Sequence, residues 1–460
     1  MKRFFSAILL LGALFVAQSS SAQLKTSYFM EGSYFRTDMN PALTPTRGYI
    51  ALPALSGFSV GQYSNYNSFE NMNYLGENGY INALDSSVPA NEFLGKLPDK
   101  CVQSFRGDLG LFRLGFYTLN KTFFNFGANL RVEYNYVTPK SFYKMMKGAY
   151  ENSFDVNDMN VDLTSYIETY AGAAFRVGEN LTIGARFKFL IGLINGLYDV
   201  NKINVENGNY SVFGNMKFNS VELDSSNYNG TTNMEDIIVN DTQDFVWSNL
   251  HSFGGAIDLG AELRLLENKL KLSAAITDLG FIKWSADTQM AGKLHLEATE
   301  RVDFFQILSD SSFDMPEKFY DYTTRLTANL NLGAEYNFLG NHFAVGALSH
   351  TRFYRNAVAT EFTTSFNMRP TNWITLTASH TFLNGNTPGI YGAAVNIHPR
   401  TLNIFFGMDY IGSKKSYVDE FTPTTVSELD QFVSPKATSY NFFVGIGFNF
   451  GRPDFLIGQH

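Results

Sequence analysis

The chain has 460 residues, of which 15% are aromatic and 17% are charged, and its formal net charge is −8. Nucleic acid binding requires a basic surface, so this acidic balance argues against a nucleic acid partner. Cys101 is the only cysteine, which excludes an intrachain disulfide and a multi-cysteine metal site. We predict no cofactor and no metal site.

Residues 1–22 have the organisation of a secretory signal peptide. A basic start precedes an apolar run from Phe4 to Ala17, and small residues follow up to Ala22. The apolar run is shorter than the roughly 20 residues that a membrane anchor helix needs. No cysteine lies directly after the cleavage site, so a lipid anchor is not expected. We predict cleavage directly after Ala22.

Residues 23–47 lack the alternating pattern of the segments that follow them. They contain Asn40, Pro41 and Ala42, and an Asn-Pro pair favours the start of a turn. One interpretation is a tight lead-in to the first strand, and the other is a plug folded into the lumen of the protein. Asn40, Pro41 and Ala42 are therefore candidate plug or turn residues.

From residue 48 to residue 450, apolar and polar residues alternate in one segment after another. The alternation from Arg325 to Phe338 is too long for an ordinary strand of about 5–6 residues. It suits a strand that crosses a bilayer in roughly 9–11 residues, with one face towards lipid. We predict fourteen strands, at about 48–63, 105–119, 122–137, 165–177, 181–200, 250–266, 269–284, 322–338, 342–354, 358–369, 373–384, 388–398, 401–411 and 438–450.

The predicted connections alternate in length. Short turns, such as 178–180 and 267–268, separate links that are mostly longer, such as 64–104 and 201–249. Bacterial outer-membrane barrels have short periplasmic turns, longer outer loops and an even strand count. A soluble propeller or sandwich gives no reason for this alternation. The predicted fold class is all-β, a transmembrane antiparallel β-barrel of about 14 strands with an N-terminal lumen or plug segment. The predicted parts are a signal peptide (1–22), the plug-like segment (23–47), the barrel (48–450) and a periplasmic tail (451–460).

Most charged residues of the predicted strands share the polar phase. A charge on the lipid face near the bilayer midplane costs about 2–4 kcal/mol, so these residues should face the lumen. Both signs are mixed, so neighbours across strands can pair, and the one-signed lining of an ion-selective pore is not visible. One strand changes phase near Gly110, where we predict a bulge. The candidate lumen-facing residues are Arg131, Glu133, Arg186, Lys188, Asp258, Glu262, Arg264, Arg325 and Glu335.

The segment at 269–284 contains an irregularity. The residues from Asp278 to Gly280 interrupt its lipid-facing alternation, and a carboxylate there needs hydrogen-bond donors. Gly280 permits a bulge or kink in the strand. Trp284 is expected near the outer interface, where an amphipathic ring is favoured. Asp278, Gly280 and Trp284 are candidate kink residues, and a kinked strand with an interfacial tryptophan is favoured over a ligand gate.

Two motifs resemble those of known outer-membrane barrels. Asn40-Pro41-Ala42 is similar to a motif that many Bacteroidetes barrels of the FadL-like and PorP/SprF-like kind carry shortly after the signal peptide. The run from Asp278 to Trp284 resembles one found in an uncharacterised Bacteroidetes family of such barrels. The resemblance spans essentially the mature chain. It implies fourteen strands, an N-terminal lumen plug and a hydrophobic ligand route.

The predicted function is passive uptake or passage of a small solute, of hydrophobic character where the FadL-like resemblance holds. The alternative is an outer-membrane scaffold that serves a secretion, gliding or surface-attachment apparatus, as the PorP/SprF-like resemblance implies. An enzyme is not expected, because Ser349-His350 and Ser379-His380 are neighbours on strands and point to opposite faces. The expected partners are outer-membrane lipids, a small hydrophobic solute, or an outer-membrane or periplasmic protein. The expected location is the cell outer membrane, after cleavage near Ala22.

Overall fold

The computed structural model describes thirteen ranges of the chain, and every structural statement below concerns these ranges. They are 25–53, 55–67, 69–76, 79–118, 122–148, 153–207, 209–221, 223–224, 250–299, 312–316, 318–383, 389–412 and 440–451. The predicted signal peptide, nearly all of the predicted tail, and loop residues such as 225–249 and 413–439 lie outside them. No helix within the described ranges is long and apolar enough to cross a membrane.

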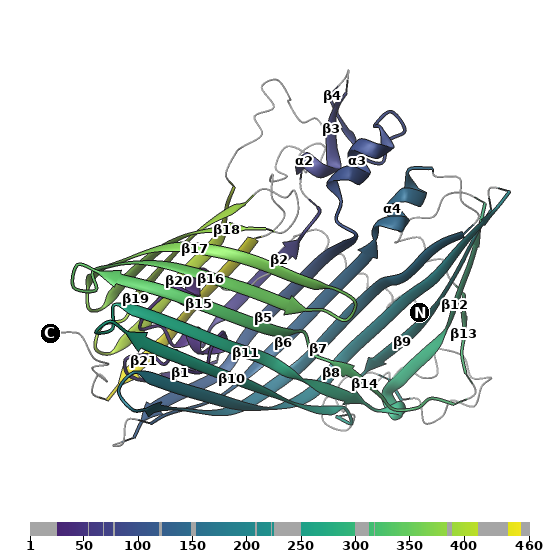
Figure 1. Cartoon of the computed structure of the whole chain (residues 1–460). Helices are drawn as coiled ribbons and strands as arrows, with labels where there is room; N and C mark the ends of the chain where they lie inside the picture. The colour runs from purple at the N-terminus through teal and green to yellow at the C-terminus, as the bar shows by residue number, and fades with distance from the viewer. Residues whose placement is uncertain are drawn as a thin grey trace.

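A single antiparallel sheet closes on itself to form a barrel of fourteen strands (Figure 1). The barrel closes where β21 pairs with β1 and β2, which together make the first strand of the wall. The predicted fold class is therefore confirmed. The wall strands are β1 (Gly48–Ala51) with β2 (Phe58–Ser64), β5 (Lys100–Tyr117), β6 (Phe123–Pro139), β7 (Ser153–Val177), β8 (Leu181–Glu206), β10 (Phe253–Leu265), β11 (Leu270–Trp284), β14 (Tyr322–Arg325) with β15 (Ala328–Phe338), β16 (Phe343–Phe353), β17 (Val358–Thr371), β18 (Ile374–Phe382), β19 (Ile390–Ile397), β20 (Leu402–Gly412) and β21 (Tyr440–Phe450).

The two ends of the barrel differ as the sequence predicts. At one end, which we call the turn end, connections such as 266–269 and 339–342 are short. Arg47 and Gly451 also meet there, with 2.9 Å between Arg47 Nη1 and the Gly451 carbonyl oxygen. The opposite, loop end carries the longer connections and further elements. These are α2 (Phe69–Met72), β3 (Asn73–Gly76), β4 (Gly79–Asn82), α3 (Ala90–Lys96), α4 (Lys140–Met146), β9 (Asn209–Ser220), η4 (Ala286–Thr288), β12 (Gln289–Ala298) and β13 (Ser312–Asp314).

A sheet projects from the loop end beyond the barrel. β7 and β8 have 25 and 26 residues, more than the roughly 9–11 that a bilayer requires. β9 pairs with the far half of β8, β12 pairs with β9, and β13 pairs with β12. We call these extensions together with β9, β12 and β13 the outer sheet. One of its faces packs on α4 in an apolar cluster.

The prediction that 201–249 and 285–321 contain only loops is thus wrong for 209–220 and 289–298. Both stretches alternate as strands do, with Val212 and Phe218 in one and Leu294 and Leu296 in the other buried on one face. β7 also begins earlier than predicted, because an irregularity between Asp155 and Met159 interrupts its alternation.

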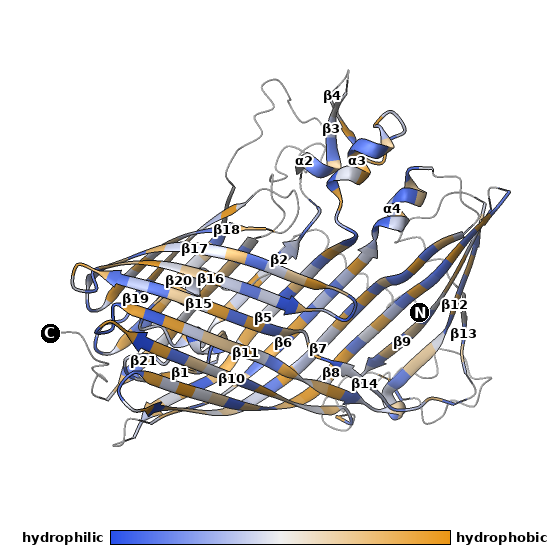
Figure 2. Cartoon of the chain, viewed as in Figure 1, coloured by the Kyte–Doolittle hydropathy of each residue, from blue (hydrophilic) through white to orange (hydrophobic). Residues whose placement is uncertain are grey.

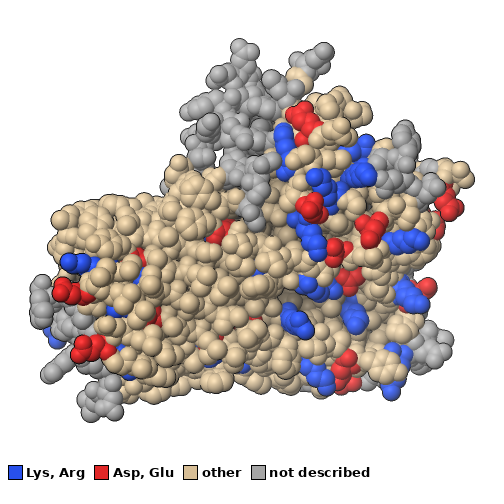
Figure 3. Space-filling view, in the orientation of Figure 1, with Lys and Arg blue, Asp and Glu red and all other residues tan. Residues whose placement is uncertain are grey.

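The outer face of the barrel is apolar and the inner face is polar. Phe187 is 71% exposed, whereas its neighbour Arg186 is 1% exposed and points into the lumen. Figure 2 shows this alternation as bands of orange and blue along the strands, and Figure 3 shows a broad area of the wall without charged side chains. The predicted bulge near Gly110 is present, as a register shift between Gly110 and Phe112 against β6. The wall therefore matches the two phases expected of a bilayer-spanning sheet.

We expect Leu332→Arg to lower the free energy of unfolding by about 2–4 kcal/mol, the cost of a cation near the midplane of the lipid face. Leu332 lies in the middle of β15 and is 47% exposed on the outer face. Denaturant titration in lipid vesicles measures the loss. Leu339→Arg is the control, because Leu339 is 70% exposed in the turn after β15 and should cost about 0–1 kcal/mol. Equal losses would contradict this assignment of the lipid-facing surface.

Candidate functional site

Residues 25–47, which we call the lumen segment, lie inside the barrel. They contain two short turns of helix, η1 (Thr26–Phe29) and η2 (Tyr34–Asp38), and most of their side chains are buried. Tyr34 and Phe35 pack with inward-facing aromatic rings of the wall. This segment ends at the turn end, where β1 begins.

Ion pairs hold the lumen segment to the wall at three separate places. Each pair joins a charge of the segment to an inward-facing charge of a strand, so the segment adds counter-charges to those that the wall itself supplies. The pairs are Lys25 with Glu361, Glu31 with Lys271 (2.9 Å) and Arg369 (3.1 Å), and Asp38 with Arg113 (2.6 Å) and Arg186 (3.0 Å).

The segment bends at Gly32, close to the turn end, where the side chain of His398 lies directly against it. A Cβ atom added at Gly32 would lie 2.6 Å from the His398 ring, and the φ of +90° at Gly32 also favours glycine. Burial lowers the pKa of His398 to about 4, so the imidazole is neutral at pH 7. The bend therefore rests on an uncharged ring.

The motif Asn40-Pro41-Ala42 forms a turn, and this turn lies in the lumen. Asn40 Oδ1 accepts a hydrogen bond from the backbone N–H of Ala42 at 2.9 Å. Its Nδ2 donates to the carbonyl oxygens of Ala261 (3.3 Å) and Ala274 (3.4 Å) on the wall. At Gly260 the wall has no side chain, and a Cβ atom there would collide with the Asn40 amide. The geometry thus combines both sequence interpretations, a turn and a segment within the lumen.

Asp278 lies at a bulge in β11. The register with β10 shifts between Ile257 and Leu259, so Thr277 and Asp278 together oppose Asp258. The φ of Asp278 is +59°, in the left-handed region, which a non-glycine residue seldom adopts. Both Thr277 and Asp278 are buried and line the same small lumen cavity. The bulge therefore turns the carboxylate away from lipid.

The Asp278 carboxylate is the centre of a buried charge cluster. Its Oδ1 accepts from Arg131 Nη1 and from Lys188 Nζ, each at 2.6 Å. Its Oδ2 accepts from Arg106 Nη1 at 3.3 Å and from Asn329 Nδ2 at 3.1 Å. These donors come from β5, β6, β8 and β15, so a single side chain connects strands from several parts of the wall. We call Asp278 and these partners the ionic cluster.

Trp284 faces the interior of the protein and not the lipid, where an interfacial tryptophan is expected. It is fully buried, and its Nε1 donates to Thr324 Oγ1 at 2.8 Å. The bulge adds a residue to β11, so the facing of every later residue is reversed. Leu279 and Phe281 consequently face lipid, while Trp284 faces inward. Gly280 leaves room for the neighbouring backbone and side chain of Ala256 on β10, which a Cβ atom would meet.

Arg325 is the one candidate lumen residue that faces the other way. It is exposed, and its paired neighbour Phe281 is 52% exposed on the outer face. The strand is interrupted at residues 326–327, between β14 and β15, and the facing changes across this break. The structure places the remaining candidates on the lumen side: Arg131, Glu133, Arg186, Lys188, Asp258, Glu262, Arg264 and Glu335.

Sequence reasoning missed the charges of β5 and of the lumen segment. Arg106, Asp108 and Arg113 lie on β5, and all three line the small lumen cavity together with Asp278. Their alternation with Phe105 and Gly107 was a usable signal, but the bulge near Gly110 obscures the facing of the strand. Asp38 carries no such signal, because its segment has no periodicity.

A small cavity remains between the lumen segment and the ionic cluster. Its volume of about 30 Å³ has room for about one water molecule. In this arrangement the segment and the cluster together fill the middle of the described lumen. The residues that line the cavity include Phe35, Met39, Ser59, Arg106, Asp278 and Asn329.

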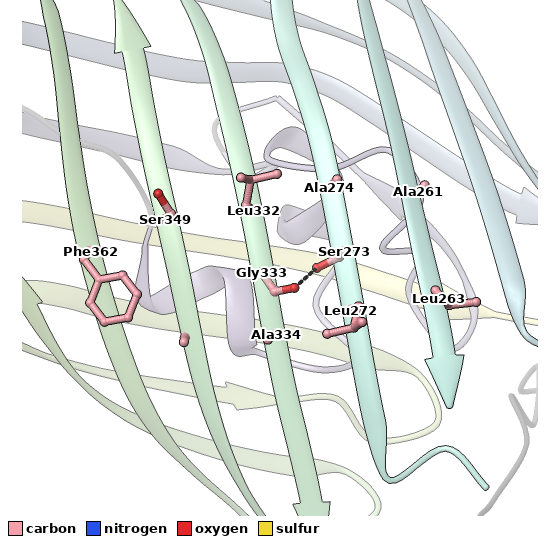
Figure 4. Close-up of a pocket in the computed structure, with 11 residues that line it drawn as sticks. Ala261, Leu263, Leu272, Ser273, Ala274, Leu332, Gly333, Ala334, Ser349 and Phe362 are labelled. Carbon is pink, nitrogen blue, oxygen red and sulfur yellow. Dashed lines mark hydrogen bonds between the residues drawn. The ribbon is translucent and has the colours of Figure 1, made fainter. Parts of the chain in front are cut away.

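A larger groove, of about 390 Å³, lies on the outer face of the wall and not in the lumen (Figure 4). Small side chains such as Ala261, Ala274 and Ala334 form its floor, and Leu272 and Leu332 stand beside them. Hydrocarbon surrounds this face in a bilayer, so lipid chains are sufficient to cover the groove. The groove is therefore no part of the candidate site.

This geometry defines a class of protein, a fourteen-stranded antiparallel transmembrane β-barrel whose own N-terminal segment fills its lumen. Residues 41–409 match the model of a family of unknown function (DUF5723), and the chain belongs to that family. No curated protein matches the sequence.

Solved structures that the chain resembles include members of the FadL family. The Pseudomonas putida toluene transporter TodX shares 10% sequence identity with this chain, at a TM-score of 0.38. The alignment covers 90% of this chain and 93% of the TodX chain. The Ralstonia pickettii toluene transporter TbuX shares 11% identity at a TM-score of 0.41, covering 94% and 96%. A Pseudomonas aeruginosa FadL homologue shares 10% identity at a TM-score of 0.37, covering 92% and 95%.

We expect Asp278→Asn to lower the free energy of unfolding by about 3–5 kcal/mol, because it leaves buried cations without their counter-charge. Asparagine tolerates the left-handed backbone, so the substitution tests the charge and not the bulge. Denaturant titration in vesicles measures the loss. The control is Asp321→Asn, whose partner Lys283 is 2.7 Å away and 62% exposed; that exposed pair is worth about 0–1 kcal/mol. A loss at Asp278 no larger than at Asp321 would contradict the central role of this carboxylate.

Proposed function

We propose that the protein is an outer-membrane channel for passive passage of a small apolar solute, and that the lumen segment gates it. The observation that carries the proposal is a patch of aromatic residues on the lumen face of the wall. A water-filled barrel has a polar interior, so an aromatic interior favours an apolar solute. The periplasm lies at the turn end, and the mature chain begins after cleavage near Ala22.

The aromatic patch is covered by the lumen segment. Tyr34 stacks on Tyr49 with ring centroids 4.4 Å apart, and Phe35 stacks on Phe405 at 4.8 Å. Phe443 packs beside Phe405 and also stacks on Phe35, with ring centroids 6.1 Å apart. When the segment moves, these wall rings become free to contact another apolar surface. The segment therefore occupies the place that we assign to the solute.

A second apolar cluster lies nearer the loop end, and we propose that solute enters past it. It includes Tyr63, Val102, Tyr354, Leu383 and Ile390. The connection at 354–357 contributes Tyr354 and Ala357 to this cluster. Below it lies the ionic cluster, which opposes an apolar solute because its charges would lose their partners. The solute therefore leaves either through an opening in the barrel wall or, after the lumen segment has moved, through the turn end.

The wall offers a place for a sideways exit between β2 and β5. Phe58–Gln62 pair with β21, but within the described residues β2 has paired positions with β5 only at Tyr63 and Ser64. Ser59 and Asp108 lie on the two sides of this seam and both line the small cavity. Regular pairing is what holds two strands together, so we propose that this seam opens to the bilayer.

A scaffold for a secretion, gliding or surface-attachment apparatus is the second candidate, and the outer sheet favours it. This sheet extends past the bilayer, as a docking surface for a protein would. The resemblance to Bacteroidetes PorP/SprF-like barrels also belongs to this candidate. Co-purification of a stoichiometric partner, lost when the exposed Lys202 and Lys293 are changed to Glu, would support it. A chain that purifies alone from its native membrane would contradict it. Neither candidate includes a catalytic step.

A reversible crosslink tests the proposed gate. Thr26 Oγ1 and Ser379 Oγ are 2.6 Å apart, so T26C/S379C in a Cys101→Ala background can join the segment to β18. Cells with this protein in the outer membrane should take up naphthalene when the pair is reduced. Oxidation should lower uptake to the level of cells without the protein, because the segment can no longer leave the aromatic patch. Glucose uptake should stay at background in both states.

The matched control is T363C/T381C in the same background. Thr363 Oγ1 and Thr381 Oγ1 are 2.8 Å apart and join two wall strands, not the segment. Its oxidation should leave naphthalene uptake unchanged. Uptake that persists in oxidised T26C/S379C would overturn the gating role of the segment. A folded chain that passes no naphthalene in either state would overturn the channel and favour the scaffold.

A further inference from the structure

The connection between β16 and β17, residues 354–357, reaches across the loop end of the lumen. In the closed wall, at least five strands separate β5 from β16 and β17 in either direction. Lys100 Nζ, at the start of β5, nevertheless donates to the Asn356 carbonyl oxygen at 2.7 Å. A contact between opposite sides of the wall requires the connection to extend over the lumen. We call residues 354–357 the strap.

Arg355 fastens the strap to the extensions of β7 and β8. Its Nε donates to Asp162 Oδ2 at 3.2 Å, and its Nη1 donates to Asp199 Oδ2 at 2.9 Å. Its Nη2 lies between the two carboxylates, 3.0 Å from Asp162 Oδ1 and 2.6 Å from Asp199 Oδ1. Each carboxylate thus receives one edge of the guanidinium plane, in the bidentate geometry that gives arginine its strongest ion pairs. We call these three side chains the clasp.

The residues of β5 show what the strap covers. Lys100 contacts the strap, and Arg106 belongs to the ionic cluster. Between them, Val102 is 1% exposed and packs in the apolar cluster to which the strap contributes Tyr354 and Ala357. Alternate residues of a strand share a face, so these three β5 side chains lie at successive depths on the lumen side. The strap therefore lies above the apolar cluster, and the ionic cluster lies below it.

The clasp differs from the ionic cluster in its contact with water. The side chains of Arg355, Asp162 and Asp199 are 33%, 14% and 30% exposed, whereas those of Lys188 and Asp278 are 1% and 4% exposed. Breaking a buried pair leaves charges without water, at a large cost. Charges that already contact water regain hydration when they separate, so an exposed pair is worth little. The clasp can therefore open and close reversibly.

We propose that the strap closes the loop end of the lumen, and that the clasp must break before solute reaches the apolar cluster. The strap is then the entrance gate, whereas the lumen segment gates the turn end. This inference rests on the proposed function, because only a channel needs an entrance gate, but its test uses no solute. Strap closure without naphthalene uptake would overturn the channel alone, and uptake without strap closure would overturn the strap alone.

Thiol labelling of the full chain in detergent micelles tests the strap. Ser104 is fully buried on β5 and is the next lumen-facing residue after Val102, so Ser104→Cys in a Cys101→Ala background places a single thiol beneath the strap. Iodoacetamide, which is small and uncharged, should alkylate this thiol slowly. Arg355→Gln should raise the rate about tenfold, which corresponds to about 1.4 kcal/mol lost from the closed state with two partly exposed pairs. Arg355→Lys should raise it about threefold, because lysine keeps the charge but lacks the fork.

Lys283→Gln is the matched control, because Lys283 forms an exposed ion pair with Asp321 on the outer face of the wall. It should leave the labelling rate unchanged. Raising NaCl from about 0.1 M to about 1 M should speed labelling of the chain with an intact clasp, because salt screens exposed charges, but not of Arg355→Gln. Equal rates with and without Arg355→Gln, or fast labelling while the clasp is intact, would overturn the strap. If Arg355→Gln does not fold, an absent salt effect on the chain with an intact clasp would overturn it.

Discussion

The structure depends on one constraint: each charged side chain that points into the lumen must be paired there with a side chain of opposite charge. The bilayer forces the polar phase of every strand inward, where the lumen segment packs against it. Asp278 meets this constraint for Arg131, Lys188 and Arg106 at distances of 2.6–3.3 Å. The lumen segment meets it elsewhere with Lys25, Glu31 and Asp38. The segment is thus part of the electrostatic balance of the wall, and not only a filler of space.

The bulge at Asp278 follows from the same constraint. Without an added residue, Asp278 would continue the alternation of Leu272 and Ile276 and face hydrocarbon. The left-handed backbone at Asp278 costs energy, and the buried donors around the carboxylate offset that cost. The same bulge reverses the facing of the rest of β11, where the partner strand changes from β15 to β14. One buried carboxylate therefore explains the position of Trp284.

The sequence predicts the features that the bilayer imposes. Predictions from the sequence are wrong or missing where contacts between residues far apart in the chain determine the structure. Fourteen strands, their turns and most of their facings are readable, because lipid enforces period two along each strand. The predictions for Arg325 and Trp284 are wrong, because the sequence indicates the interruption at 278–280 without showing that it adds a residue, and gives no sign of the break at 326–327. The sequences of β9 and β12 alternate clearly, but both lie within long connections, for which the sequence analysis predicts loops. The contacts of Asp38 with Arg113 and Arg186 join residues far apart in sequence, so no local pattern encodes them.

The lumen is layered, and the order of the layers bears on how a gate could work. The aromatic patch at the turn end lies below the ionic cluster, and an apolar cluster lies above it. Moving the lumen segment into water would expose rings on both the segment and the wall, at a cost that grows with the apolar area. An apolar solute that replaces Phe35 against Phe405 keeps the wall rings covered and so lowers that cost, whereas water cannot. On the proposed function, the solute itself therefore favours the open state, and water alone leaves the barrel closed.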